Sequence, residues 1–539
     1  MKTDFIEQVE HHLRAKSLQE LKSLVVRMAA KMPPDCYSEI LDILEDKCVI
    51  IDKNINFQID AEAELIRIRT FLDEIEDYNI EAYYNEGYHW SDDEEDGWQI
   101  ESDDGFARDF MNCYSKAERL LVQGMYIEAA EAFRLLYEAI EKFDNYNSSH
   151  DYGEISIDTF INEGLLDVDM RQIRKLRCYT ALMSPLTNLK TELYYIFDIS
   201  ASHFTQRAIA FKDILDAGSE PVPNRDAVLT EWIEVLSKKD VKIAAPYVKE
   251  SAQLLGKLDV LEQFVKTIGV AEPIAHLELC EMLTELEFAP SEIVAAAKFG
   301  LQNTPTEAQK RDSLASVLAD TAREAGDEES YGYAVLERFY SAQRVENYLA
   351  VLRLNSEDAN NAALGRLKEQ KDKADCHIIR MLNGDYKTTF DIIKEDKKAL
   401  GWSFSLKGQM FPFFIGMLSG FDEKAFAAQK LIGEVNATKG LYSILKERYR
   451  HNADEHNSCY EWCVNEVSAR VDAIVGAQHR GAYFRAAWLI VAMCELCILK
   501  NETSPFALLH EFVAKYPRHS AFRGEIRSAV SEVKLQVKV

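Results

Sequence analysis

The stretch AERLLVQGMYIEAAEAFRLL, Ala117–Leu136, decides the fold class because it contains two amphipathic segments and the turn between them. Apolar residues recur three and four positions apart on both sides of Gly124, which is the spacing that places side chains on one face of a helix. Gly124 can end the first helix, since glycine readily adopts the left-handed conformation that closes many helices. Tyr126 opens the second helix, and Ala129 and Phe133 follow on its apolar face. The stretch therefore predicts a helical hairpin.

This hairpin resembles the tetratricopeptide (TPR) type, although Leu136 stands where a small residue is expected. In such hairpins a small residue lets two helices approach closely, and the aromatic residue fills the space between neighbouring pairs. Two further copies of the pattern contain the candidate packing residues Gly384 and Tyr386, and Gly481, Tyr483 and Ala486. The three copies lie 260 and 97 residues apart, which does not match the TPR period of about 34 residues. We expect a degenerate, α-solenoid-like array.

Composition supports an all-α fold for the whole chain. The 539 residues include only 23 Gly and 12 Pro, both well below their usual shares of about 7% and 5%. Few turn-forming residues in a long chain favour long helices over short strands. Amphipathic helical spacing recurs at 3–14, 18–31, 226–237 and 328–340, whereas a short strand is expected only at 48–58.

The charge distribution argues against nucleic acid and anionic membranes as direct partners. The chain has 62 Lys and Arg against 90 Asp and Glu, a formal net charge of −28, and this surface repels other anions. Residues 401–539 carry 17 basic and 14 acidic residues, so the C-terminal part is slightly basic. Its basic residues include Arg470, Arg480, Arg485, Arg518, His519 and Arg523. Ordinary surface charge and salt bridges to the acidic N-terminal part are the simplest explanation of these residues.

Cysteine usage and the N-terminal segment predict a cytoplasmic protein. The ten cysteines are scattered, and most lie within apolar helical patterns, as expected of free thiols in a reducing compartment. The segment MKTDFIEQVEHH has no apolar region of a secretory signal. The longest apolar run, Ala486–Leu499, contains Glu495 and is shorter than the roughly 20 residues of a membrane span. We expect a buried core helix there.

No motif predicts catalysis or a bound cofactor. Gly476 and Gly481 have the glycine spacing of a phosphate-binding loop, but Ala482 replaces the lysine that contacts the phosphates. His510 and Glu511 begin a zinc-protease pattern, yet Ala514 stands in place of its second histidine. We therefore expect no catalytic residue, no cofactor and no metal ligand.

Two metal-site hypotheses remain as alternatives. Cys494 and Cys497 form a CxxC pair, which could bind zinc together with Cys459 and Cys463 or act as a redox pair. The pair lies in an apolar helical pattern, where cysteine usually packs as a small hydrophobic residue.

The acidic segment around Asp92, Glu94, Asp96 and Gly97 could bind calcium, but Asp103 occupies the position where an EF-hand has glutamate. A solvated spacer or a site for a basic partner are the other interpretations of this segment, which holds eight acidic and no basic residues between Tyr88 and Gly105.

The patterns together predict seven segments. They are an N-terminal helical domain (1–80), an acidic loop (81–105), a TPR-like helical region (106–216), a linker (217–225), a helical repeat region (226–400), a hinge (401–414) and a separable C-terminal helical domain (415–539). The hinge follows from Gly401 and Gly408, and from the change in charge near residue 401.

Several stretches resemble a family of poorly characterised bacterial TPR-like helical proteins. They are FIEQVEHHLRAKSLQELKSLVVRMAAKMPP (5–34), the region 88–129, GWSFSLKGQMFPFF (401–414), RVDAIVGAQHRGAYFRAA (470–487) and KYPRHSAFRGEI (515–526). Related helical regions accompany SWIM zinc fingers. This chain has no Cys-x-Cys, so the zinc-binding role of that finger does not carry over.

In length and layout the chain also resembles the substrate protein of type III-E CRISPR systems. The resemblance implies cleavage by a caspase-like (CHAT) protease between a large N-terminal and a small C-terminal part, with the N-terminal part acting on a sigma factor. On that hypothesis the hinge offers an extended, accessible segment, and Leu406, Lys407 or Met410 lies near the cleaved bond. The alternative for the hinge is a short loop between helices that packs into the core. The alternative for the chain is a standalone bacterial scaffold of unknown pathway.

Overall fold

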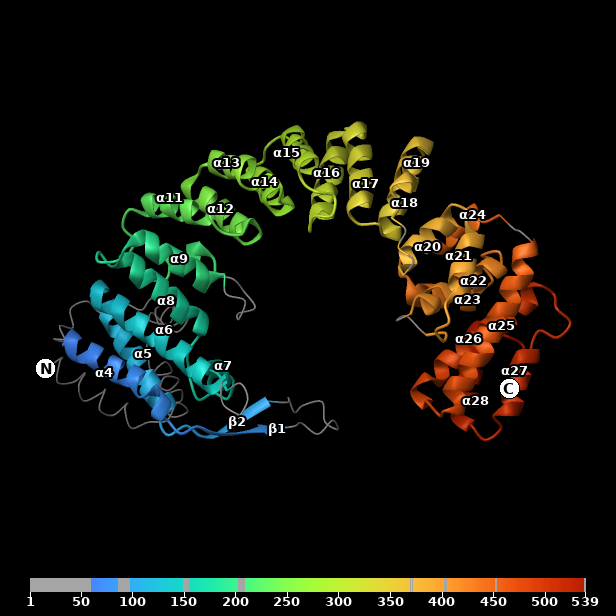
Figure 1. Cartoon of the computed structure of the whole chain (residues 1–539), viewed down its shortest axis with the longest axis horizontal. Coiled ribbons are helices and arrows are strands. Elements are labelled where there is room, and N and C mark those ends of the chain that lie inside the picture. The colour runs from blue at the N-terminus through green and yellow to red at the C-terminus, as the bar shows by residue number, and fades with distance from the viewer. Residues whose placement is uncertain are drawn as a thin grey trace, which may run out of the picture. The chain divides into compact units, whose positions relative to one another are not determined.

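The computed structural model describes residues 60–85, 97–148, 155–201, 209–368, 370, 372–401, 405–450 and 453–537. Over these residues the protein is all-α, as predicted, with helices α4 to α28 and one two-stranded sheet (Figure 1). The strand expected at 48–58 lies outside the described residues. Packing divides the chain into two compact units, which meet between Val235 and Leu236.

The first unit contains eight α-helices among its described residues. They are α4 (Ala61–Asp73), α5 (Phe106–Val122), α6 (Tyr126–Ser148), α7 (Ile157–Asn162), α8 (Met170–Met183), α9 (Leu189–Ser200), α10 (Phe211–Leu215) and α11 (Arg225–Leu236), with the short 3-10 helix η2 (Ile75–Asp77) after α4. The last residue of α11 belongs to the second unit.

Aromatic rings fill the core between α4, α5, α6 and α7. Phe106 stacks on Phe143 with ring centroids 4.4 Å apart, and Phe160 and Phe71 lie within 5.1 and 5.8 Å of the same ring. All four side chains are buried. Phenylalanine side chains contribute about 1.5–3 kcal/mol each when buried, so this cluster holds the four helices together.

The segment expected as an acidic loop (81–105) begins and ends in β-structure. Strand β1 (Glu81–Asn85) pairs antiparallel with β2 (Gly97–Ser102), and Ala82 lies opposite Ile100. Both side chains pack against the aromatic core, which explains why the acidic composition did not prevent strand formation. The loop prediction is therefore wrong for these two stretches.

The expected linker (217–225) is packed against the first unit. It contains no helix until Arg225, but Val222 is buried, and the Tyr179 hydroxyl donates a hydrogen bond of 2.6 Å to the Glu220 carbonyl. A Cβ on Gly218 would lie 2.2 Å from the Tyr179 ring, so only glycine fits this close approach.

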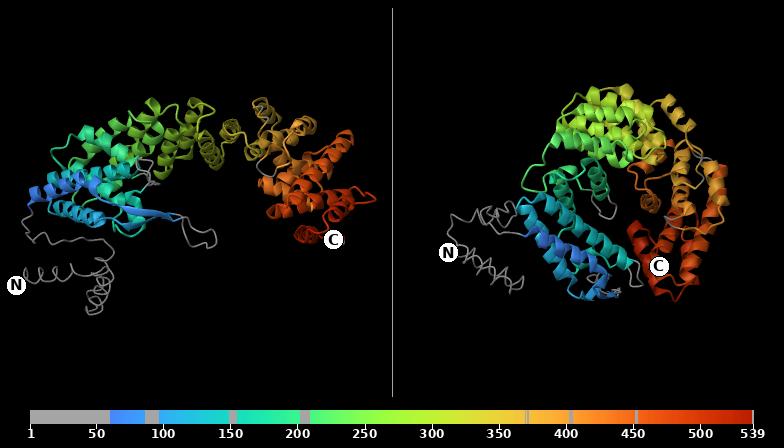
Figure 2. Two further views of the ribbon diagram at one scale, coloured as in Figure 1. Left: turned by 60° about the horizontal axis from the view of Figure 1, so that its bottom comes forward. Right: turned by 60° about the vertical axis from the view of Figure 1, so that its left-hand side comes forward.

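The second unit begins with helices that stack as successive hairpins. They are α12 (Val241–Leu255), α13 (Leu258–Thr267), α14 (Pro273–Glu285), α15 (Pro290–Asn303), α16 (Arg311–Ala325), α17 (Glu328–Ser341), α18 (Val345–Arg353), α19 (Glu357–Gly365), α20 (Ala374–Leu382) and α21 (Tyr386–Glu395). Helices α12, α14 and α16 contact one another in succession, and α15 and α17 each contact the next hairpin. Figures 1 and 2 show this order from three directions, and it is consistent with stacked helical hairpins.

The remaining helices of the second unit share a core with the array. They are α22 (Leu406–Leu418), α23 (Phe426–Val435), α24 (Leu441–Arg448), α25 (Ala453–Gly476), the 3-10 helix η3 (Arg480–Ala482), α26 (Tyr483–Leu499), α27 (Ala507–Lys515) and α28 (Ser520–Val533). One cluster of buried side chains runs from Val335 to Val533. Residues on both sides of the expected boundary at 401–414 thus contribute to the same core.

Helix α26 lies at the centre of this core. By length and composition the stretch Arg480–Leu499 could span a membrane, but 72% of its apolar window is buried inside the protein. Helices α23, α25, α27 and α28 all pack against it. The apolar surface of α26 is therefore covered by other helices, as expected of a core helix.

Candidate functional site

The first predicted packing motif forms the turn between α5 and α6. Gly124 has a φ of +72° and closes α5, while Tyr126 begins α6. Ala129 and Phe133 are fully buried, and α5 and α6 pack against each other. The glycine is required here because left-handed backbone is costly for residues with a Cβ.

In the other two motifs the aromatic residue packs against another ring, but the two motifs differ in their glycines. Gly384 has a φ of +85° before α21, and Tyr386 packs edge-on against Tyr449 with ring centroids 5.2 Å apart. Tyr483 packs in the same manner 5.7 Å from Phe522, and Ala486 is fully buried below it. Gly481 lies inside η3 without a positive φ, so its conformational freedom is not used.

The hinge residues lie in a helix. Leu406, Lys407 and Met410 belong to the first two turns of α22, and Lys407 and Met410 are buried. The Lys407 ammonium is 3.0 Å from the Glu466 carboxylate on α25. Ser405 caps the helix by accepting a 3.1 Å hydrogen bond from the Gly408 N–H. The expected extended, accessible segment is therefore wrong for residues 406–414, because long-range packing with α25 stabilises the helix.

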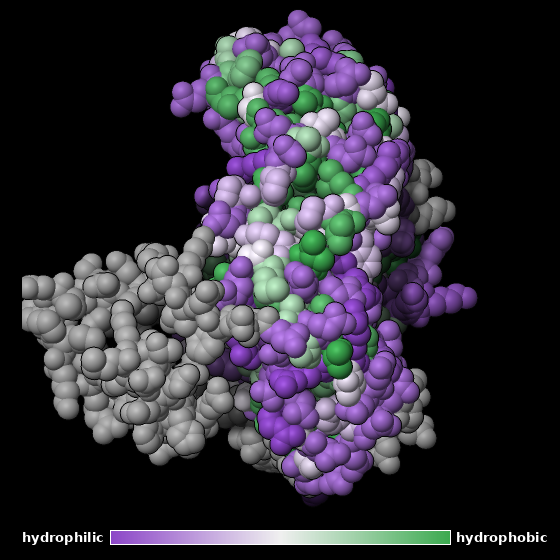
Figure 3. All heavy atoms as spheres, turned by 90° about the vertical axis from the view of Figure 1, so that its left-hand side faces the viewer, coloured by the Kyte–Doolittle hydropathy of each residue, from purple (hydrophilic) through white to green (hydrophobic). Residues whose placement is uncertain are grey.

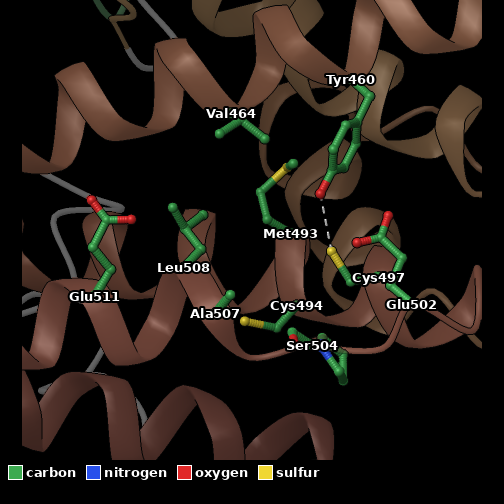
Figure 4. Close-up of a pocket in the computed structure, with 11 residues that line it drawn as sticks. Tyr460, Val464, Met493, Cys494, Cys497, Glu502, Ser504, Ala507, Leu508 and Glu511 are labelled. Atoms are coloured by element: carbon green, nitrogen blue, oxygen red, sulfur yellow. Dashed lines mark hydrogen bonds between the residues drawn. The ribbon is translucent and has the colours of Figure 1, made fainter.

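A cavity of about 200 Å³ brings the CxxC pair together with polar residues from α25, α27 and the loop after α26. It is lined by Tyr460 and Val464 of α25, Met493, Cys494 and Cys497 of α26, Glu502, Ser504 and Pro505 of the following loop, and Ala507, Leu508 and Glu511 of α27. The Tyr460 hydroxyl is 3.2 Å from the Cys497 sulfur (Figure 4). In this view the Glu502 carboxylate lies beside Cys497, and Glu511 lies at the other end of the cavity.

Both thiols are neutral at physiological pH. Burial raises the pKa of Cys494 to about 12. Burial also raises the pKa of Cys497, where the Glu502 carboxylate opposes ionisation and the Tyr460 hydrogen bond favours it. Since the thiolate is the reactive and metal-binding form of cysteine, these residues behave here as packed hydrophobic groups.

The zinc alternative has no geometric support in the described part of the chain. Cys459 and Cys463 lie one turn apart on α25 and are buried. Within the described ranges no group of three or more His, Cys, Asp and Glu side chains is arranged to hold a metal ion.

The hypothesis that the acidic segment binds calcium can be examined only at Asp103 and Gly97 among its named residues. Asp92, Glu94 and Asp96 lie outside the described residues. The Asp103 carboxylate accepts hydrogen bonds of 3.1 Å from the Gly105 N–H and 2.8 Å from the Ala107 N–H. Asp103 therefore caps the start of α5, which accounts for this acidic residue without a metal.

Sequence reasoning missed the buried ionic residues that connect the hairpins. The Lys249 ammonium on α12 lies within 4 Å of three α14 carboxylates, those of Glu278, Glu281 and Glu285. Arg311 on α16 is buried and donates a 2.6 Å hydrogen bond to Glu337 on α17. Amphipathic spacing contains no signal for these pairs, because a charged residue next to an apolar face usually points to solvent.

Glu495 is a further residue whose role emerges only from the structure. It lies in the middle of α26, where its carboxylate accepts hydrogen bonds of 3.0 and 2.8 Å from the N–H groups of Phe426 and Ala427. These N–H groups begin α23, so Glu495 caps that helix from a distance of nearly 70 residues. The only sign of this role in the sequence is that Glu495 is the single acidic residue within the apolar run Ala486–Leu499.

Comparison with models of known protein families and with curated proteins gives no significant match. The function of the chain must therefore be argued from its fold, its surface and the sequence resemblances.

Proposed function

We propose that this chain is a non-enzymatic protein-interaction protein. The observation that supports this proposal is the succession α12 to α17, in which the hairpins pack on one another. Lys249 pairs from α12 with carboxylates of α14, and Arg311 donates from α16 to the Leu301 carbonyl of α15. Such arrays present long exposed helix faces on a rigid frame, and these faces typically bind peptides or proteins. The neutral thiols of the Cys494 cavity supply no nucleophile at physiological pH.

Three large apolar side chains of the array are exposed, and a partner protein could bind to them. Leu286 and Phe288, in the turn between α14 and α15, are 51% and 36% exposed, and Phe299 of α15 is 41% exposed. A different face, drawn in Figure 3 from the left-hand side of Figure 1, also shows hydrophobic residues among hydrophilic ones. Contiguous exposed apolar side chains mark many protein interfaces, so these three residues on consecutive elements are the candidate anchors to test.

The test uses the full chain with two matched surface variants. A tagged protein is incubated with native lysate, and captured proteins are identified by mass spectrometry and then purified with the chain. We expect a partner that co-elutes in gel filtration. The double variant Leu286→Asp and Phe288→Asp should lose it, whereas Leu186→Asp, at an exposed position of the first unit, should retain it. Failure of the wild-type protein to retain any partner would contradict the proposal.

The resemblance to type III-E CRISPR substrates extends the proposal to a specific pathway. The chain would be cut by a CHAT protease, and its N-terminal part would then act on a sigma factor. Since Lys407 and Met410 are buried in α22, cleavage near them requires that the start of this helix opens first.

Incubation with an activated CHAT protease tests this extension directly. Ser405→Ala removes the N-cap of α22, which should cost about 1 kcal/mol. If cleavage follows opening of the helix, this variant should be cut roughly fivefold faster than the wild-type chain. Ser356→Ala removes the matching N-cap of α19 and should leave the rate unchanged. If the wild-type chain is not cut, the extension to a protease substrate is wrong. The proposal of an interaction protein is then unaffected.

A further inference from the structure

Two turns far apart in the sequence converge at one end of the α25–α28 bundle. The turn between α25 and α26 lies beside the turn between α27 and α28, since α26 packs along α28 (Figure 1). The Tyr483 ring is 5.7 Å from Phe522, and the Tyr516 ring is 6.3 Å from Phe522. The Tyr516 hydroxyl lies only 3.5 Å from the position of a Cβ on Gly476. These contacts fix the backbone of both turns.

The converging segments contain no acidic residue. Residues 473–494 and 512–524 lack both Asp and Glu, in a chain with a net charge of −28. We call the basic residues at these turns the basic corner, which comprises His479, Arg480, Arg518, His519 and Arg523. Of the carboxylates that border these segments, Asp472 is engaged by the Lys515 ammonium at 2.6 Å and the Tyr516 hydroxyl at 2.7 Å, whereas Glu525, two residues after Arg523, is exposed.

The basic corner has unused hydrogen-bonding capacity. Across the described residues, no salt bridge involves Arg480, Arg518 or Arg523. The Nε of Arg523 and the Nδ1 of His519 are buried from water and have no hydrogen-bond partner. Leaving a buried polar group unpaired costs about 1–3 kcal/mol. These two atoms are covered by protein, so an anionic ligand would instead bind through the accessible parts of Arg480 and Arg518, which are exposed, and of Arg523, which is half-buried.

We propose that the basic corner binds an acidic segment of a partner protein, an inference that rests on the proposed interaction function. Guanidinium groups bind carboxylates through paired hydrogen bonds, and three of them lie on two fixed turns. Exposed Phe484, next to Arg485 at the same turn, adds apolar contact area that a peptide can use. Nucleic acid fits less well, because a long polyanion extends beyond the corner and meets the repulsive field of a chain with charge −28.

Fluorescence anisotropy of a labelled oligoglutamate peptide tests the corner in the full-length protein. The triple variant Arg480→Gln, Arg518→Gln and Arg523→Gln should bind the peptide about tenfold more weakly than wild type. A control variant, Lys238→Gln, Lys242→Gln and Lys257→Gln, makes the same change in net charge at exposed positions of α12 and its flanking turns. It should bind as wild type does. Equal melting temperatures of the three proteins establish that the variants are folded.

Two outcomes would overturn the inference. One is equal weakening in both triple variants, which would show that net charge alone controls binding. The other is tighter binding of a labelled oligothymidylate of equal length through the same arginines, which would identify a nucleic-acid site. Loss of partner capture without loss of oligoglutamate binding would instead count against the proposed function, so the two failures are distinguishable.

Discussion

At the scale of single residues, the most consequential side chain is Arg311. Its guanidinium donates to the Leu301 carbonyl at 2.8 Å, to the Ser341 hydroxyl at 2.8 Å and to the Glu337 carboxylate at 2.6 Å. It therefore joins three consecutive helices of the array, α15, α16 and α17. A buried charge with partners of this quality is costly to disrupt, since removal of one member leaves the other unpaired.

We expect Arg311→Ala to lower the free energy of unfolding by about 3–5 kcal/mol, because it leaves Glu337 buried without its counter-ion. Arg323→Ala is the matched control on the same helix, since its side chain is 65% exposed. The control should cost about 1 kcal/mol or less. Urea denaturation followed by circular dichroism measures both values, and equal losses would contradict the structural role of Arg311.

Glu495 makes the second unit sensitive to pH. Burial raises the pKa of this carboxyl to about 7 from its ordinary value of 4.5, although the N–H groups of Ala427 and Phe426 favour its ionised form. The folded protein therefore holds the proton more tightly than the unfolded chain does. Stability from this group is fully present below pH 4.5 and is lost as pH rises through 7.

The comparison of wild type with Glu495→Gln isolates this contribution. Between pH 4.5 and 7.5 the stability of the wild-type protein should fall relative to the variant by about 3 kcal/mol, which corresponds to a pKa change of two to three units. Glu525→Gln, at an exposed position of α28, should leave the pH dependence of the wild type unchanged. A wild-type pH profile identical to that of Glu495→Gln would show that the carboxyl titrates normally.

At the scale of elements, the spacing of apolar residues predicted that helices form but not always where each helix begins and ends. Gly124, Tyr126 and Phe133 were identified from local pattern alone, because a glycine turn between apolar stripes needs no distant partner. The start of helix α22 was predicted to be a hinge from Gly401, Gly408 and the change in charge near residue 401, because glycines often interrupt helices.

The structure explains why α22 forms in spite of its proline. Pro412 lacks an N–H and costs a helix about 3 kcal/mol. The Phe414 ring lies 5.5 Å from Phe390 and 5.6 Å from Trp462, and Phe411 lies 5.8 Å from Trp462. Burial of two such rings contributes roughly 3–6 kcal/mol, which offsets the proline. Trp462 is about 50 residues further along the chain, so local sequence could not reveal it.

Two glycines provide a test of the turn between α5 and α6. Gly124→Ala should destabilise the protein by about 1 kcal/mol, because its φ of +72° is unfavourable for alanine although no atom obstructs a Cβ there. Gly332→Ala, within α17 and equally unobstructed, should instead stabilise by about 0.5–1 kcal/mol. Thermal melting distinguishes the two signs, and stabilisation by both variants would mean that Gly124 does not close the helix.

At the scale of the whole molecule, two clusters of buried side chains are separate from each other. One cluster, in the first unit, runs from Leu65 to Leu176, and the other, in the second unit, runs from Val335 to Val533. No residue belongs to both. The sequence indicated a boundary from its change in charge near 401, but surface charge does not report on which apolar faces meet.

The separation of the cores predicts independent effects of core truncation. Phe133→Ala and Phe413→Ala each remove a fully buried ring and should each cost about 3–5 kcal/mol. Because the two sites share no packing partner, the double variant should lose the sum of the two values within about 0.5 kcal/mol. Differential scanning calorimetry should show each single variant shifting a different part of the transition. A strongly non-additive double variant would indicate a single cooperative core.

The candidate binding surface was only partly predictable. Arg480, Arg518 and Arg523 were recognised as basic residues of the C-terminal part, but their meeting at one corner depends on α26 packing along α28. The neutral state of Cys494 could be anticipated from its apolar surroundings in the sequence. The Tyr460 hydroxyl next to Cys497 could not, since it comes from α25, 37 positions away.

The central position of α26 also has a consequence during synthesis on the ribosome. Helices α27 and α28, which cover α26, are made after it, and 34 residues separate Leu499 from Val533. At roughly 5–20 residues per second, about two to seven seconds pass between synthesis of the end of α26 and synthesis of the end of α28. That interval is long compared with helix formation, which takes about a microsecond. We therefore expect α26 to be helical before two of its covering helices exist, and a chain that stops before α27 to expose the α28-facing side of α26 and to aggregate.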